Sequence, residues 1–160
     1  MQKSRNAKVV IVVGGRGTGK TTYLEKLCAG KKNVIVFQLM TDERYKGHPK
    51  MLYSNFCICR SLCNKRVIIE DATQLIASNP TNDIRKIVVS SKQMGTDVYF
   101  VFHSFNIVPP YLWQLFDFCV IFPCAEIKKT SGLAEYYEEF AKIQRKKGVK
   151  YKPLAVIKAH

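Results

Sequence analysis

The clearest pattern in the sequence is a series of short apolar runs separated by polar segments. The runs are rich in β-branched and aromatic residues, and none is long enough for a buried helix. Near-continuous apolar runs of this kind are typical of strands in a parallel sheet that is buried on both faces. Strands are therefore predicted at residues 8–13, 34–37, 67–69, 97–102 and 118–122, with a last edge strand at residues 151–157.

Between these runs, apolar spacing and the positions of glycine and proline predict helices and loops. Helices are predicted at residues 19–28, 53–64, 81–94 and 131–147, a short turn or helix at residues 72–78, and a polar loop at residues 41–50. The inward face of the helix at 81–94 is predicted to hold Ile84, Ile87, Val88 and Ser91. Alternating strands and helices indicate an α/β fold with a mainly parallel central sheet flanked by helices.

The segment after the first predicted strand carries the most specific motif. Residues 14–21 fit the pattern G-x-x-x-x-G-K-[ST] between a strand and a helix, which is the context of a phosphate-binding loop. Glycines let backbone N–H groups approach a triphosphate, Lys20 reaches the β- and γ-phosphates, and the Thr21 hydroxyl ligates Mg²⁺. ATP and Mg²⁺ are expected to be bound by Gly15, Arg16, Gly17, Thr18, Gly19, Lys20, Thr21 and Thr22.

Polar residues follow two later strands. Glu70 and Asp71 come directly after the third predicted strand, and His103 after the fourth. The carboxyl ends of parallel strands meet at one edge of a sheet, where α/β proteins bind ligands. We therefore expect these residues to converge on the loop, with Thr21, Glu70 and Asp71 as candidate metal ligands. An acidic strand end that only caps the following turn is the alternative.

Length and composition limit the number of domains and the class of protein that the chain can form. With 160 residues, 47% of them hydrophobic, it is expected to form one globular domain over residues 1–160. No apolar run approaches the ~20 residues of a membrane helix, and Met1 to Lys8 lack the apolar core of a signal peptide. We therefore expect no membrane insertion and a cytoplasmic location, in the host cytoplasm or the virion if the protein is viral.

The charge balance points to a polyanionic partner. The chain carries 26 basic and 12 acidic residues, a formal net charge of +14, and such a field attracts polyanions. The basic residues gather in an N-terminal arm at residues 1–7 and a C-terminal segment at residues 142–160. Nucleic acid, and double-stranded DNA in particular, is the predicted partner. Charge that serves only colloidal stability is the alternative.

The six cysteines are expected to be reduced, as is usual for a cytosolic nucleotide-binding fold. Cys57, Cys59 and Cys63 lie near His48 in the sequence, but their spacing matches no strong zinc signature. Small buried hydrophobic residues are the favoured interpretation of these cysteines.

An aromatic-rich turn at residues 105–113 contains Trp113, the single tryptophan of the chain. Such a turn can stack on bases or contact a neighbouring subunit. More often it packs as core beneath a loop, and that is the expectation here.

The order of these motifs resembles the additional-strand, catalytic-glutamate group of P-loop ATPases. The region from Arg66 to Glu126 is most similar to its HerA/FtsK class. In that class a helix with basic residues follows the acid-ending strand, and the next strand ends in a polar sensor before a proline-bearing turn. The corresponding positions are Arg85, Lys86, residues 95–98, His103, Pro109, Pro110 and residues 118–122. The resemblance implies a three-layer P-loop NTPase, and relatives include DNA-packaging ATPases of viruses and Zot-like assembly ATPases of filamentous phages.

The resemblance also implies roles for individual residues. Lys20 would grip phosphate, Glu70 would hold Mg²⁺ together with Thr21, and Asp71 would orient the attacking water. The family usually has Asp before Glu, so this chain inverts the order. Because Asp is shorter by one methylene, the inversion implies slow hydrolysis or an exchange of the two roles.

Three further positions have implied roles. His103 occupies the sensor position, where a neutral imidazole can hydrogen-bond the γ-phosphate or water; a structural histidine is the alternative. Arg85 is the candidate arginine finger that reaches a neighbouring subunit's nucleotide, with Arg60 and Arg66 as rivals. Arg16 lies inside the loop. It either stabilises charge on the phosphates, as an arginine finger does, or pairs with Glu70 or Asp71 while the site is empty.

These observations predict a DNA-stimulated ATPase that acts as a homo-oligomeric ring. Its predicted task is to package or translocate a viral or mobile-element genome, with a capsid or portal protein as a further partner. Two other functions stay open: a small P-loop kinase of nucleotides or nucleosides, and a Zot-like assembly ATPase. A kinase usually needs an arginine-rich lid over its acceptor, and the loop at residues 41–50 is only a faint candidate.

Overall fold

The computed structural model describes residues 6–38, 44–52, 62–78, 84–124, 127–146 and 152–159. Within these ranges the chain forms a seven-stranded sheet in the order β3-β2-β4-β5-β1-β6-β7. Every strand pair is parallel except β6 with β7, so the predicted mainly parallel sheet is confirmed. The strands are β1 Val9–Val13, β2 Val34–Gln38, β3 Lys50–Leu52, β4 Arg66–Ile69, β5 Asp97–Phe102, β6 Phe118–Ile121 and β7 Ala155–Lys158.

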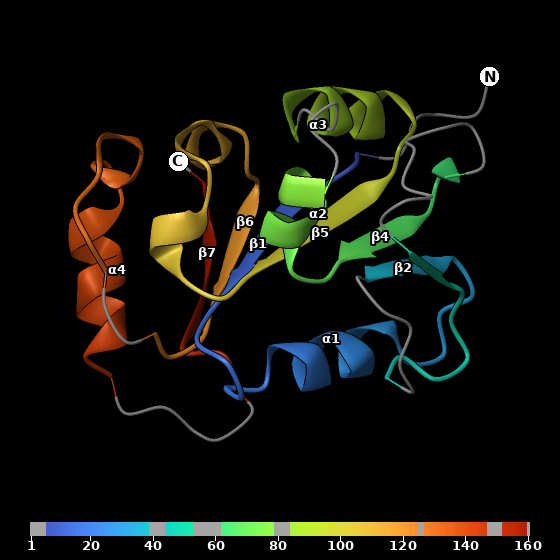
Figure 1. Ribbon diagram of the computed structural model, residues 1–160, viewed down its shortest axis with the longest axis horizontal. Helices are drawn as coiled ribbons and strands as arrows, with labels where there is room; N and C mark the ends of the chain where they lie inside the picture. The colour runs from blue at the N-terminus through green and yellow to red at the C-terminus, as the bar shows by residue number, and fades with distance from the viewer. Residues whose placement is uncertain are drawn as a thin grey trace.

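Helices cover both faces of the sheet and give the three layers that the sequence predicts (Figure 1). Helix α1 lies on one face, α2 and α3 lie on the other, and α4 stands beside β6 and β7 at one end of the sheet. The helices are α1 Lys20–Cys28, α2 Ala72–Ser78, α3 Ile84–Gln93 and α4 Tyr137–Gln144, with 3-10 turns η3 Phe105–Ile107, η4 Pro110–Gln114 and η5 Ser131–Leu133.

Strand β1 lies in the interior of the sheet, and its surroundings explain why its sequence is apolar throughout. Successive side chains of a strand point to opposite faces of the sheet. Val9, Ile11 and Val13 belong to the core beneath α2 and α3, whereas Val10 and Val12 belong to the core shared with Leu24 and Cys28 of α1. Both faces are therefore withdrawn from water, and a polar residue at any position of β1 would be buried.

The strand order decides which strand ends lie next to the loop after β1. Strand β5 lies between β1 and β4, so the acids after β4 are one strand away from that loop. The backbone N–H of Gly14 donates to the carbonyl of Phe102 at the end of β5, with an N···O distance of 3.2 Å. The carboxyl ends of β1, β4 and β5 consequently form one edge, as the sequence predicts.

Two predicted elements differ from the observed ones. Strand β3 was not predicted: it pairs in parallel with β2 at the end of the predicted loop, and its three residues are too few to show a strand pattern. The helix predicted at 131–147 is α-helical only over Tyr137–Gln144. A Cβ atom at Gly132 would lie 2.5 Å from the Cα atom of Pro110, so close packing of η5 against η4 replaces the first helical turns. The helix predicted at 53–64 falls mostly outside the described residues.

The aromatic turn is part of the core. Trp113 is 3% exposed, and its ring packs against the rings of Phe105, Phe116 and Phe140 at centroid distances of 5.5–6.0 Å. Phe140 comes from α4, so this cluster attaches the last helix to the sheet. The expectation that the turn packs as core is confirmed, which leaves Trp113 unavailable for stacking on bases.

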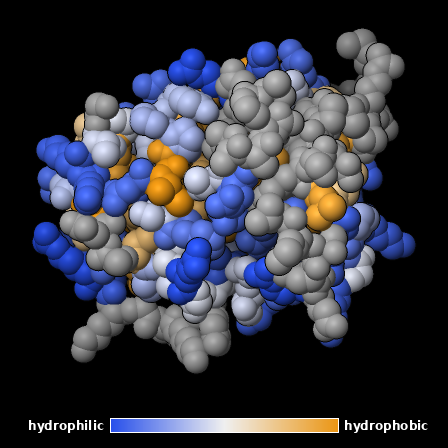
Figure 2. Space-filling view, viewed as in Figure 1, coloured by the Kyte–Doolittle hydropathy of each residue, from blue (hydrophilic) through white to orange (hydrophobic). Residues whose placement is uncertain are grey.

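The coloured part of the surface in Figure 2 is mainly hydrophilic, and hydrophobic side chains reach it in small, separate groups. Among the described residues, the large hydrophobic side chains that are exposed are Leu52, Val89, Ile107 and Val156. In the part of the chain that the structure describes, no helix is long and apolar enough to cross a membrane.

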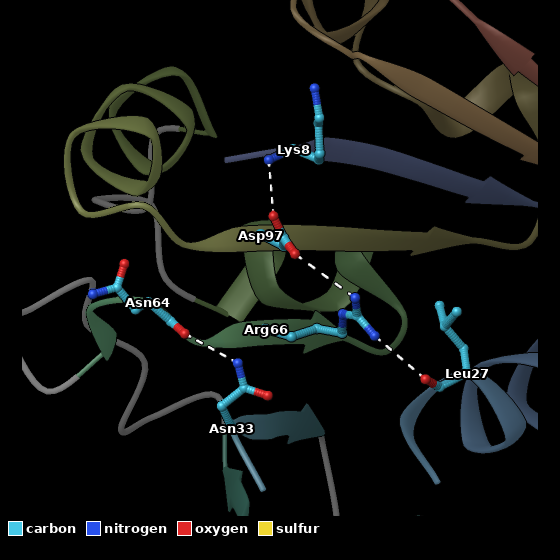
Figure 3. A network of polar contacts seen from close by, with 6 residues as sticks. All are labelled: Lys8, Leu27, Asn33, Asn64, Arg66 and Asp97. Carbon is cyan, nitrogen blue, oxygen red and sulfur yellow. Dashed lines mark hydrogen bonds and ion pairs between the residues drawn. The ribbon is translucent and has the colours of Figure 1, made fainter. Parts of the chain in front are cut away.

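The amino edge of the sheet is held by a buried ion pair (Figure 3). Arg66 begins β4 and Asp97 begins β5, and their side chains lie 3.8 Å apart between nitrogen and oxygen. Asp97 also accepts a hydrogen bond of 3.0 Å from the backbone N–H of Lys8, and Arg66 donates to the carbonyl of Leu27 at 3.3 Å. Arg66 is therefore a buried structural residue at the edge opposite the loop, and its interpretation as an arginine finger is wrong.

Replacing Asp97 by alanine should lower the free energy of unfolding by about 3–5 kcal/mol, because Arg66 would stay buried without its carboxylate. The measurement is urea unfolding followed by circular dichroism. A double variant, Arg66→Leu with Asp97→Leu, removes both charges and should recover much of the loss. Equal stability of Asp97→Ala and the wild type would contradict a structural ion pair.

Candidate functional site

The loop at residues 14–19 is shaped by close packing and by left-handed backbone. A Cβ atom at Gly14 would lie 2.4 Å from Cβ of Phe122, so only glycine fits there. Gly17 and Gly19 have φ values of 71° and 102°, which favour glycine. The N–H of Gly15 donates to the carbonyl of Pro123 at 2.8 Å. The loop is thus fixed between β5 and the end of β6, with α1 starting directly after it.

Lys20 begins α1 and lies inside the loop. Its side chain is buried, and its Nζ donates to the carbonyls of Gly14 and Gly15 at 2.6 and 2.7 Å. Burial lowers the pKa of this ammonium group, while the carboxylates of Glu70 and Asp71 act in the opposite direction. The cation is held at the centre of the loop, where its position suits contact with phosphate.

Thr21 and Glu70 bring the loop and β4 together. The Thr21 hydroxyl donates to Oε1 of Glu70 at 3.2 Å. Mg²⁺ takes oxygen ligands at about 2.0–2.1 Å in octahedral geometry, which places neighbouring ligand oxygens about 3 Å apart. The hydroxyl and the carboxylate therefore have both the chemistry and the spacing of two ligands of one Mg²⁺ ion.

Tyr45 also contacts Glu70, and the sequence analysis missed it. The Tyr45 hydroxyl donates to Oε1 of Glu70, and the Tyr45 N–H donates to Oε1 of Glu25 on α1 at 2.7 Å. Tyr45 is 1% exposed, and burial, followed by the charge of Glu70, raises its pKa well above the ordinary value. The hydroxyl therefore stays protonated and remains a donor. A large aromatic residue in an otherwise polar loop was the available signal.

Asp71 and His103 form a second pair at the same edge. Oδ2 of Asp71 lies 3.5 Å from Nε2 of His103, and both side chains are half-buried. Asp71 has a φ of 50°, a left-handed conformation that costs energy for a residue with a Cβ atom. Burial lowers the pKa of His103, and the charge of Lys20 adds to this effect while Asp71 opposes it. The imidazole is therefore neutral at neutral pH.

The other predicted loop residues line the same turn. Thr18 donates through its hydroxyl to the carbonyl of Gly15 at 2.8 Å, which closes the loop. Thr22 is half-buried in the first turn of α1, and Arg16 is exposed. The charge of Arg16 lowers the pKa of both Lys20 and His103, so the guanidinium adds to the positive potential at the loop.

The candidate arginine finger lies on α3. Arg85 is exposed, and its guanidinium carbon lies 4.5 Å from the ring centre of Tyr111. This stacking on Tyr111 of η4 holds the first turn of α3 against the segment that follows β5. A role at a neighbouring subunit's nucleotide stays a prediction for Arg85. Its remaining rival, Arg60, lies outside the described residues.

The described cysteines differ in exposure, and Cys124 is half-buried. Cys28 and Cys119 are fully buried, as expected for small hydrophobic side chains, whereas Cys63 is exposed and does not fit that interpretation. Cys57 and Cys59 lie outside the described residues. Within the described ranges, no group of three His, Cys, Asp or Glu side chains is arranged to hold a metal ion.

Comparison with known proteins identifies the fold. The sequence matches no protein-family model and no curated protein. The structure is similar to the genome packaging NTPase B204 from Sulfolobus turreted icosahedral virus 2. With ATP-gammaS bound, that protein superposes with a TM-score of 0.71 at 14% identity, over 96% of this chain and 93% of its own. With AMP bound, the TM-score is 0.70 at 13% identity, over 97% and 94%.

A second B204, the DNA-packaging ATPase from Sulfolobus Turreted Icosahedral Virus, superposes with a TM-score of 0.54 at 12% identity, over 87% of this chain and 85% of its own. Together with the seven-stranded sheet and the loop between β1 and α1, these similarities show that the chain has the P-loop NTPase fold.

The lowered pKa of His103 predicts a pH dependence of stability. The unfolded chain, with the ordinary histidine pKa of about 6.5, binds a proton that folded His103 does not, so acid favours unfolding. Between about pH 8 and about pH 5, the wild type should lose stability relative to His103→Gln. Urea unfolding of both proteins at each pH measures the difference in their free energies of unfolding. Titrating groups that the two proteins share contribute equally to both and do not affect this difference. A difference that is independent of pH would show that His103 is not buried in its neutral form.

Proposed function

We propose that this protein is a Mg²⁺-dependent ATPase. The observation that carries the proposal is the convergence of three separate segments at one sheet edge: Lys20 and Thr21 from the loop, Glu70 and Asp71 after β4, and His103 after β5. A glycine-rich turn without a ligand would not need a buried lysine, a hydroxyl and two carboxylates around it.

In this proposal each residue has one task. Lys20 exchanges its two carbonyl acceptors for phosphate oxygens when ATP enters. Thr21 and Glu70 hold Mg²⁺, which neutralises charge on the phosphates. Asp71, which lies beside His103, orients the attacking water, and neutral His103 contacts the γ-phosphate or that water. This division keeps Glu70 on the metal side and Asp71 on the water side.

The strand order supports assignment to the additional-strand group. Its name refers to a strand inserted between the one that leads into the phosphate loop and the one that ends in acids, and β5 occupies this place between β1 and β4. We place the protein in the HerA/FtsK class of that group, with the inverted Glu70–Asp71 order as its own feature.

We further propose that the ATPase acts on double-stranded DNA as a homo-oligomeric ring and packages or translocates a genome. The net charge of +14 and the similarity to proteins whose names specify genome packaging support this proposal. In the ring, Arg85 reaches the nucleotide of a neighbouring subunit, and a capsid or portal protein is a further partner. Such a protein would work in the cytoplasm of its host.

The division of roles predicts different effects for the two acids. Lys20→Ala should abolish hydrolysis, and Asp71→Asn should lower kcat by roughly 100-fold with little change in the KM for ATP. Glu70→Gln should raise the Mg²⁺ concentration needed for half-maximal rate. Lys26→Ala, on the exposed side of the same helix, is the control and should behave like the wild type. If Asp71→Asn keeps full activity, another group activates the water.

The ring proposal predicts complementation between inactive variants. Lys20→Ala and Arg85→Ala should each be inactive alone, whereas their mixture should regain part of the ATPase rate. The reason is that a Lys20→Ala subunit still supplies Arg85 to an Arg85→Ala neighbour with an intact loop. Duplex DNA should stimulate the wild type. Inactive mixtures would contradict an arginine finger at this position, and phosphate transfer to a nucleoside without DNA stimulation would favour a kinase.

A further inference from the structure

An open pocket of about 610 Å³ lies beside α1, away from the phosphate loop. One wall is the end of α1 and the turn after it, and the other is the segment that follows β2. The residues lining the pocket are Glu25, Ala29, Gly30, Lys31, Lys32, Tyr45, Lys46, Gly47 and His48. None of the predicted site residues borders this pocket, so nucleotide binding does not account for it.

The residues that line the pocket carry a net positive charge. Lys31, Lys32 and Lys46 are exposed around it, and His48 is half-buried. Glu25 is the single acid among the lining residues, and its Oε1 already accepts the hydrogen bond from the N–H of Tyr45. Three lysines around one engaged carboxylate create a concave surface that attracts anions.

Two glycines keep the rim of the pocket clear of side chains. Gly30 and Gly47 have φ values of 73° and 80°, so their turns favour glycine. No atom lies within 4 Å of the position that a Cβ would take at either residue. An extended phosphate backbone can therefore approach the main chain at both sides of the pocket.

The pocket is connected to the acid that is the candidate Mg²⁺ ligand. Tyr45 lines the pocket, and its hydroxyl donates to Oε1 of Glu70, the oxygen that also accepts from Thr21. Its N–H holds Glu25, one turn along α1 from Thr21. A shift of Tyr45 would change the hydrogen bonds of Glu70 directly, because no other residue intervenes.

We infer that this pocket contacts the phosphate backbone of double-stranded DNA, and that Tyr45 is the positioning residue through which the contact alters Glu70. The inference rests on the proposed ATPase function and adds where DNA binds and how it stimulates hydrolysis. The basic C-terminal segment is the competing surface. We favour the pocket because it is concave and because Tyr45, one of its lining residues, donates a hydrogen bond to Glu70.

The binding site is tested by two variants that remove the same charge. The pocket variant is Lys31→Ala with Lys32→Ala and Lys46→Ala; the matched control is Lys142→Ala with Arg145→Ala and Lys146→Ala, all of them exposed. Binding of a fluorescent DNA duplex is measured by anisotropy over a salt series. The pocket variant should bind at least about tenfold more weakly, and the slope of log affinity against log salt should become shallower by about 2–3. The control should stay close to the wild type.

The role of Tyr45 is tested by the ratio of DNA-stimulated to basal ATPase rate. Tyr45→Phe keeps the ring and removes the hydroxyl, so it should retain duplex binding within about twofold while the ratio falls toward one. Tyr99→Phe removes a hydroxyl from the same side of the core and should keep the wild-type ratio. A Tyr45→Phe protein that is stimulated like the wild type would overturn the positioning role.

The outcomes separate the inference from the proposed function. If the wild type hydrolyses ATP and binds DNA, but the C-terminal variant rather than the pocket variant loses binding, the pocket assignment is overturned and the ATPase proposal stands. A wild type that hydrolyses ATP without binding duplex DNA overturns the DNA-directed function and the pocket together. Unfolding curves of both triple variants confirm that each is folded.

Discussion

The carboxylate of Glu70 is the group on which the arrangement of the site depends. It is 9% exposed, and a buried carboxylate is costly unless hydrogen-bond donors and opposite charge surround it. Thr21 and Tyr45 both donate to its Oε1, and the charge of Lys20 lies close by. These contacts with the Glu70 carboxylate bring together the phosphate loop, the end of β4 and the segment after β2, which are far apart in the sequence.

Charged side chains are arranged differently at the amino and carboxyl ends of the parallel strands. At the amino edge, Arg66 and Asp97 neutralise each other and hold the starts of β4 and β5 together. At the carboxyl edge, the charges of Glu70 and Asp71 both act on Lys20, and Asp71 adopts a left-handed backbone. Fixed charge at one edge supports the sheet, while exchangeable hydrogen bonds and local strain at the other suit a site that must accept a ligand.

Sequence patterns located most of this edge correctly because they report local requirements. The loop motif, the apolar run of β1 and the acids after β4 each depend on neighbours in the sequence, so their positions agree with the structure. The patterns failed where a distant contact decides the local structure. The helix predicted from residue 131 is interrupted because Gly132 packs on the backbone of Pro110. Tyr45 looked like part of a polar loop because its partner, Glu70, comes 25 residues later.

The sequence by itself determined the P-loop motif, the alternation of strands and helices, the two adjacent acids and the excess of basic residues. These features are local or additive, and they can be counted along the chain. Only the tertiary structure decided which acid faces Thr21 and which faces His103, that Arg66 is structural, and that three lysines surround a pocket joined to Glu70. The reason is physical: strand order and side-chain direction, which no local pattern contains, set the distances between residues from different segments.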